Sequence, residues 1–184
     1  MREVDELVLS LRVELGKTEP NDKFQVAINS IAEFYMSNFN VSSNEVAILL
    51  TNKQKTVLSF AHPHYLVDAG MIPISLNEAI ASRIFKSGKG LIDNNFHHQR
   101  HLSIFESIRT PENRILPIWK MIAARISQSD DHIGIVEISK RSVNLDEAGL
   151  DFSISDLHFL EESLVKIAPI IKEFMPDDFK GKFK

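Results

Sequence analysis

The chain has 184 residues, a length suited to one domain with extensions. Hydrophobic residues make up 43% and charged residues 25%, which is typical of a folded soluble protein. The net charge of −4 comes without a block of Lys and Arg, which disfavours nucleic acid as a partner. Because there is no cysteine, disulfides, thiolate nucleophiles and cysteine-ligated zinc are excluded.

The first part of the chain predicts two helices and a hairpin. Residues 1–15 carry an apolar stripe at helical spacing, close to a heptad seam, and Gly16 is a plausible stop. A helix this short needs either the body of the domain or a partner chain, and both alternatives stay open. A second amphipathic helix is expected after Asp22 as its N-cap. The apolar runs 46–50 and 57–61 then predict a β-hairpin.

The middle of the chain predicts loops around one helix and one short strand. Residues 62–73 lack a period and indicate a loop. Ser75 and Glu78 have the spacing of a capping box, so a third helix is expected to begin there, followed by a short strand at residues 90–93. Residues 94–113 predict a long irregular connection, which in a compact domain is usually a binding loop or lid.

The stretch from 115 to 141 predicts a long β-hairpin at the centre of a sheet. Gly134 within its second strand indicates a close backbone approach or a bulge. Ser153 and Asp156 then predict a capped last helix, which Pro169 should kink or divide. This order of elements, without regular βαβ alternation, favours an α+β domain with a mainly antiparallel sheet of about five or six strands.

Three segments, taken together in their order and spacing, resemble the GAF domain family. They are residues 70–94, the pair 116–118 and 132–140, and residues 152–157, within a resemblance that covers about 22–172. The resemblance implies a central antiparallel sheet with the N- and C-terminal helices on one face and ligand-pocket loops on the other. It also implies a small-molecule sensory or regulatory domain.

The expected organisation is an N-terminal helix and linker at 1–21, a GAF-like domain at 22–175 and a mobile tail at 176–184. The N-terminus lacks the features of a signal peptide and no apolar segment approaches the ~20 residues of a membrane span, so a cytoplasmic location is expected. The expected partners are a second copy, through the N- and C-terminal helices, a small molecule and a signalling protein, with neither nucleic acid nor membrane.

The family's fullest signature pairs Asn-Lys with a downstream Phe and Asp-Glu. The matching positions here are Ser139, Lys140, Phe152, Asp156 and Leu157. The resemblance therefore implies an ion pair between Lys140 and Asp156 that ties the strand end to the last helix. The changes to Ser139 and Leu157 count against cyclic-nucleotide binding.

The candidate ligand site gathers polar and aromatic residues around the predicted loops. Asp93, Asn94 and Phe96 offer hydrogen bonds and a stacking face, although they could equally be turn formers. Phe60 and Trp119 could line a cavity or belong to the core. The predicted ligand-binding residues are Phe60, His62, Asp93, Asn94, Phe96, His97 and Trp119.

The histidines provide a less favoured alternative. His97, His98 and His101 lie close in sequence, and His62 and His64 could approach them, which would suit metal or haem binding, but no His-Glu-x-x-His pattern follows. No metal site is therefore predicted and no cofactor is identified. Without a nucleophile elbow, P-loop or Gly-x-Gly-x-x-Gly motif, we do not expect an enzyme. A ligand-free GAF-like dimerisation or protein-interaction module is the second hypothesis.

Overall fold

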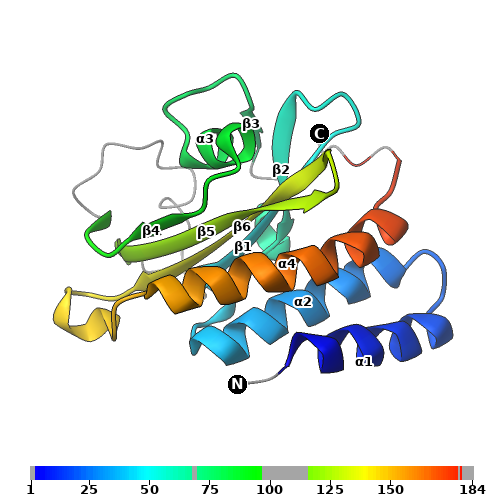
Figure 1. Ribbon diagram of the computed structural model, residues 1–184, viewed down its shortest axis with the longest axis horizontal. Coiled ribbons are helices and arrows are strands. Elements are labelled where there is room, and N and C mark those ends of the chain that lie inside the picture. The colour runs from blue at the N-terminus through cyan, green and yellow to red at the C-terminus, as the bar shows by residue number, and fades with distance from the viewer. Residues whose placement is uncertain (1–2, 68–69, 97–115, 178, 180–184) are drawn as a thin grey trace.

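The computed structural model describes the chain except for residues 1–2, 68–69, 97–115, 178 and 180–184. It is an α+β fold, as predicted, built on a six-stranded antiparallel sheet in the order β3-β2-β1-β6-β5-β4 (Figure 1). The strands are β1 (Val46–Thr51), β2 (Val57–His62), β3 (Met71–Pro73), β4 (Leu91–Asp93), β5 (Ile118–Gln128) and β6 (Asp131–Arg141). The helices are α1 (Val4–Lys17), α2 (Lys23–Phe39), α3 (Ile80–Ser87) and α4 (Ile154–Phe174).

The hairpin of β5 and β6 lies within the sheet, and β6 is one of its two central strands. Ile122 pairs with Ile138 in a ladder that runs along both strands, which confirms the prediction for the described part of 115–141. The predicted close approach at Gly134 is also confirmed. A Cβ at this position would lie 2.1 Å from the Leu49 carbonyl oxygen on β1, so only glycine fits.

One face of the sheet is covered by α2 and α4, and α1 packs against both helices (Figure 1). Leu7, Leu11 and Leu15 of α1 are buried in this core. Deep between α2 and α4, the hydroxyl groups of Tyr35 and Ser163 lie 2.9 Å apart in a hydrogen bond. The apolar stripe of α1 is therefore covered by its own chain, which is the first of the two alternatives for this helix.

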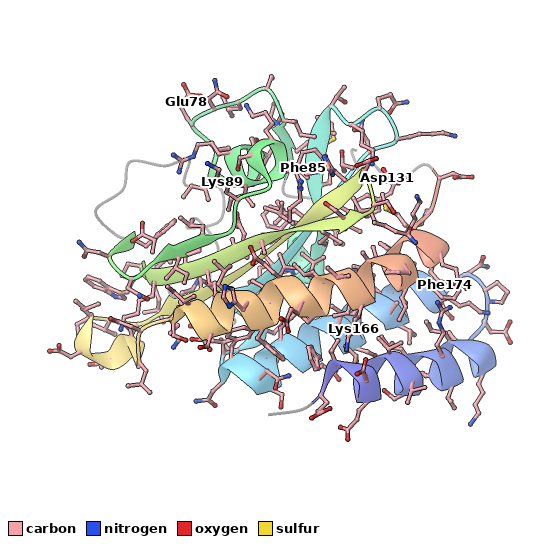
Figure 2. The ribbon with its side chains drawn as sticks, in the orientation of Figure 1. Glu78, Phe85, Lys89, Asp131, Lys166 and Phe174 are labelled. Atoms are coloured by element: carbon pink, nitrogen blue, oxygen red, sulfur yellow. The ribbon has the colours of Figure 1, made fainter. Side chains whose placement is uncertain are left out.

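Ion pairs close the outer edge between α1 and α4. Figure 2 shows Lys166 directed from α4 towards α1, where its Nζ lies 2.7 Å from Asp5 Oδ1. Arg12 forms a second pair with Glu173. No described helix has both the length and the apolar character needed to cross a bilayer.

The opposite face of the sheet carries α3 and a second apolar core (Figure 1). Ile84 and Phe85 of α3 are buried there, together with Leu49 of β1 and Ile135 of β6. Figure 2 shows Phe85 lying between α3 and the central strands. We call this side the α3 face. The two cores follow from the alternation of side chains along each strand.

Several predicted element ends are wrong. The third helix begins at Ile80, not at Ser75, because the Leu76 and Ala79 amides close turns to the carbonyl oxygens of Pro73 and Leu76. The first helix continues through Gly16 to Lys17. Asp22 is at the N-cap of α2, but its side chain makes no capping bond.

Other predictions about loops and caps had mixed outcomes. The expected loop at 62–73 contains the short edge strand β3, which pairs Ile72 with Leu58. The capping box of Ser153 and Asp156 is confirmed, since the Asp156 amide donates to Ser153 Oγ at 3.2 Å. Pro169 does not divide α4, which continues to Phe174. Most of the expected 94–113 loop lies outside the described residues.

Candidate functional site

Three buried polar residues occupy every second position in the C-terminal half of β6. Glu137, Ser139 and Arg141 share the parity of Ile135, whereas Val136 and Ile138 lie in the helix-side core. Because successive side chains of a strand point to opposite faces, the three polar residues lie on the α3 face. All three are buried, so each requires an explanation.

Two members of this row have structural partners. Ser139 Oγ donates to the Glu45 carbonyl oxygen at 3.3 Å, and the Arg141 amide donates to Glu45 Oε1 at 2.6 Å. Arg141 Nη1 also donates to the Leu116 carbonyl oxygen at 3.3 Å. Glu45 thereby fixes the end of β6 against the turn that precedes β1.

Glu137 differs from its neighbours. Its residue surface is only 5% exposed, and among the described residues its carboxyl group has no hydrogen bond and no salt bridge. Burial raises its pKa from 4.5 to about 7, and the attraction of Arg141 opposes that rise. The residues paired with it on the two adjacent strands are both alanines, Ala47 on β1 and Ala123 on β5.

The surroundings of Glu137 on the α3 face are apolar. Phe60 of β2, Met121 of β5 and Phe96, which follows β4, belong to the same buried cluster as Ala47 and Ala123. The structure therefore brings two of the predicted ligand residues, Phe60 and Phe96, onto the face that carries Glu137. Their contact with a ligand stays a prediction.

Trp119 and Asp93 lie near this face but have local contacts of their own. Trp119 Nε1 donates to the Ser142 carbonyl oxygen at 3.0 Å, where the pairing of β5 and β6 is irregular. Asp93 Oδ1 accepts a hydrogen bond from the Asn95 amide at 2.9 Å, as expected of a turn former.

Asn94 joins the end of β4 to the start of α4. Its Nδ2 donates to the Phe152 carbonyl oxygen at 3.0 Å, and its Oδ1 accepts from the Phe152 amide at 2.9 Å. The side-chain amide is thus paired with one residue of the segment 149–153 that leads into α4. We call residues 149–153 the α4 lead-in.

Two lysines hold the same α4 lead-in from the sheet. Lys120 Nζ lies 2.6 Å from the Gly149 carbonyl oxygen and 2.7 Å from Asp151 Oδ1. Lys140 Nζ donates to the Leu150 carbonyl oxygen at 2.6 Å and lies 4.5 Å from the centre of the Phe152 ring. Side chains of both β5 and β6 therefore bind the segment just before α4.

The predicted ion pair between Lys140 and Asp156 is not formed. Asp156 Oδ2 accepts from the Ser153 amide at 2.7 Å and from Ser153 Oγ at 2.8 Å, so the carboxylate is engaged by the helix cap. Lys140 instead binds the α4 lead-in, and Asp156 acts on it only through a longer-range attraction. Burial is the main cause of the lowered pKa of Lys140. The strand-to-helix link exists, but through other atoms.

His62, another of the predicted ligand-binding residues, does not share the α3 face with Phe60. A bulge in the pairing of β1 and β2 follows Phe60, so that the side chain of His62 lies on the opposite face of the sheet from Phe60. There His62 lines a surface hollow of about 400 Å³ beside α2. Its Nε2 lies 3.2 Å from the Ser43 carbonyl oxygen, and its buried Nδ1 has no partner. Burial lowers its pKa, which favours a neutral ring.

The proposed histidine group cannot be assembled from the described residues. His97, His98 and His101 lie outside them. In the ranges that the structure describes, no three His, Asp or Glu side chains come close enough to hold a metal ion. Metal or haem binding stays the less favoured alternative.

A second hollow, of about 380 Å³, lies at the tip of the central hairpin. Figure 2 shows Asp131 at this tip, near the end of α4. Asp131 lies 2.7 Å from the Nζ atoms of both Lys55 and Lys172, and these bonds hold the pKa of its carboxyl below its usual range. Since both oxygens are engaged by lysines, Asp131 serves to join β1–β2, β5–β6 and α4.

Sequence reasoning missed Glu137. The available signal was a single carboxylate inside the apolar run of a predicted central strand, at a position whose parity matches buried neighbours. A charge at such a position is rarely buried without a partner.

No protein-family model and no curated protein sequence matches the chain. Solved structures do. The GAF domain of a phosphoenolpyruvate-protein phosphotransferase from Coxiella burnetii superposes with a TM-score of 0.64 at 8% identity, over 92% of this chain and 93% of that one. The corresponding Acinetobacter GAF domain gives a TM-score of 0.61 at 10% identity, over 94% and 96%.

A free methionine-R-sulfoxide reductase from Neisseria meningitidis, solved with its substrate, is also similar. Its TM-score is 0.59 at 12% identity, over 92% of this chain and 88% of that one. Identities this low show a shared fold. The chain therefore has a GAF fold, and the resemblance found in the sequence is confirmed at that level.

Proposed function

We propose that this chain is a GAF-type sensory domain that binds a small molecule on its α3 face and signals through its terminal helices. The observation that carries the proposal is the pairing of Asn94 with Phe152, since it links residues beside the buried Phe96 to the start of α4. A ligand that reorders the end of β4 would move the α4 lead-in with it. The proposal includes the cytoplasmic location and the protein partner expected from the sequence.

The same contacts support a role in binding rather than catalysis. Lys120, Lys140 and Asn94 are all engaged in holding the α4 lead-in. Among the described residues, the buried Glu137 carboxyl group has no hydrogen bond or salt bridge to another acid or base. We accordingly propose no enzymatic activity.

The test is a thermal-shift screen against nucleotides, amino acids, haem and divalent metals, followed by hydrogen exchange. A compound that binds the native state raises Tm. The proposal expects such a compound to slow exchange at residues 152–157. A compound that saturates the protein without changing exchange there contradicts signalling through α4, and a silent screen favours the second candidate.

The second candidate is a ligand-free dimerisation or protein-interaction module. It is favoured by exposed apolar side chains on the terminal helices: Leu9 is 69% exposed and Val13 is 61% exposed on α1, and Val165 on α4 is 68% exposed. These side chains face outward from the buried stripe and could meet a second copy. Light scattering distinguishes this candidate, since it requires a dimer whether or not a ligand is present.

A further inference from the structure

We infer that Glu137 receives the positively charged group of the bound small molecule, so that the ligand is a small organic ammonium or amidinium compound with an apolar body. This inference rests on the proposed function and names the class of ligand for the same face.

The carboxyl group of Glu137 is isolated from the polar groups of the described chain. Glu137 is more than nine-tenths buried and has no hydrogen bond or salt bridge among the described residues. An ionised carboxylate in such a place costs several kcal/mol unless a cation or donors satisfy it. Arg141, four residues along β6, attracts it but is held by the Leu116 carbonyl oxygen at 3.3 Å. A cation from outside the described chain would supply the missing partner.

The side chains opposite Glu137 on the adjacent strands are small. Ala47 and Ala123 flank Glu137 on the two adjacent strands and lie on the same face. Because the side chain of alanine is a single methyl group, neither Ala47 nor Ala123 is long enough to cover the carboxyl group of Glu137.

The other side chains of this cluster on the α3 face are apolar. Phe60, Phe96 and Met121 belong to the same apolar cluster, which suits a ligand with a hydrocarbon or aromatic body. Aromatic faces also attract organic cations. A divalent metal ion would need several oxygen or nitrogen ligands, and the described residues offer no such group. An anionic ligand would be repelled by the carboxylate.

The carboxyl group of Glu137 can change between its protonated and its ionised form when a ligand binds. Burial raises its pKa to about 7 when no cation is bound. A bound cation favours the ionised form and would lower that pKa. The attraction between the two charges is strong because the site is buried.

The experiment uses the full chain and three matched probes: benzylammonium, benzyl alcohol and benzoate. Calorimetric titration at about pH 8, where Glu137 is mostly ionised, measures each affinity. We expect benzylammonium to bind more tightly than the other two. Glu137→Gln keeps the size of the side chain and removes its charge, and should weaken benzylammonium binding about tenfold or more. Glu162→Gln on the exposed surface of α4 is the matched control and should bind as the wild type does.

Each outcome decides the inference. Preference for benzylammonium that is lost only in Glu137→Gln supports it. Equal binding of the three probes, no binding of any, or unchanged binding by Glu137→Gln overturns it. Hydrogen exchange at residues 152–157 keeps the proposed function separate. Benzoate binding that slows this exchange would overturn the ligand class and leave sensing intact, whereas benzylammonium bound at Glu137 without any change there would leave the class intact and contradict sensing.

Discussion

The side-chain amide of Asn94 forms two hydrogen bonds with the backbone of Phe152, one donated and one accepted, at 3.0 and 2.9 Å. These two bonds join the end of β4 to the α4 lead-in. Lys120 and Lys140 bind the neighbouring carbonyl oxygens of Gly149 and Leu150. The start of α4 is therefore positioned by side chains from β5, from β6 and from the residue that follows β4.

Replacing Asn94 by Ala should lower the free energy of unfolding by about 1–3 kcal/mol, because the amide and carbonyl groups of Phe152 lose their partner. Urea denaturation measures the change. Asn95→Ala is the matched control, since Asn95 is exposed and only its backbone amide bonds Asp93. Equal stability of the two variants would show that the pairing contributes nothing.

The stability of the protein should fall as pH rises from about 4.5 to about 7 because of Glu137. Its pKa is raised in the folded state, so the native protein binds more protons than the unfolded chain in this window. A rise from 4.5 to about 7 corresponds to about 3 kcal/mol lost by the upper end.

The variant Glu137→Gln should lack this loss and be more stable than the wild type at about pH 8. Urea denaturation of both proteins at several pH values checks the prediction. A wild type and variant with parallel pH profiles would mean that Glu137 is not held in a buried, unpaired state.

Gly134→Ala should prevent or severely weaken folding, because its Cβ would lie 2.1 Å from the Leu49 carbonyl oxygen in the central pairing of β1 and β6. Gly16→Ala is the opposite case. Nothing lies within 4 Å of that Cβ, and alanine favours a helix over glycine by about 1 kcal/mol. Thermal denaturation should show a large loss for the first variant and a small gain for the second.

The oligomeric state should depend on the exposed residues of α1 rather than on its buried stripe. Leu11 and Leu164 are both buried in the core, so Leu11→Asp or Leu164→Asp should unfold the protein whatever its oligomeric state. Leu9→Asp should keep the fold, because Leu9 is exposed. If the chain dimerises through this helix, light scattering should show Leu9→Asp to be a monomer, and a dimer unaffected by this change would place the interface elsewhere.

Much of the fold could be predicted because long apolar patterns determine it. The apolar runs of β5 and β6 and the apolar stripe of α2 are local patterns, which the sequence carries. Shorter elements could not be predicted in the same way. β3 has three residues and ends in Pro73, which is tolerated at a sheet edge but gives no strand signal. The capping pattern at Ser75 failed because the chain there closes turns after β3.

The candidate site was harder to predict because it depends on pairing between distant strands. Nothing local indicates that Ala47 and Ala123 flank Glu137, since the register of three strands brings them together. The predicted pair of Lys140 and Asp156 fails because the carboxylate of Asp156 accepts hydrogen bonds from Ser153 in the helix cap instead. His62 shows the effect of one bulge, which moves a side chain to the other face.

In the proposed function, binding on the α3 face reaches α4 through Asn94 and Phe152. Hydrogen exchange of residues 152–157 in the full chain, with and without a saturating compound that raises Tm, tests this route. We predict slower exchange in the wild type, and no slowing in Asn94→Ala although that variant still binds the compound. Unchanged exchange in the saturated wild type, or equal slowing in Asn94→Ala, would contradict this route.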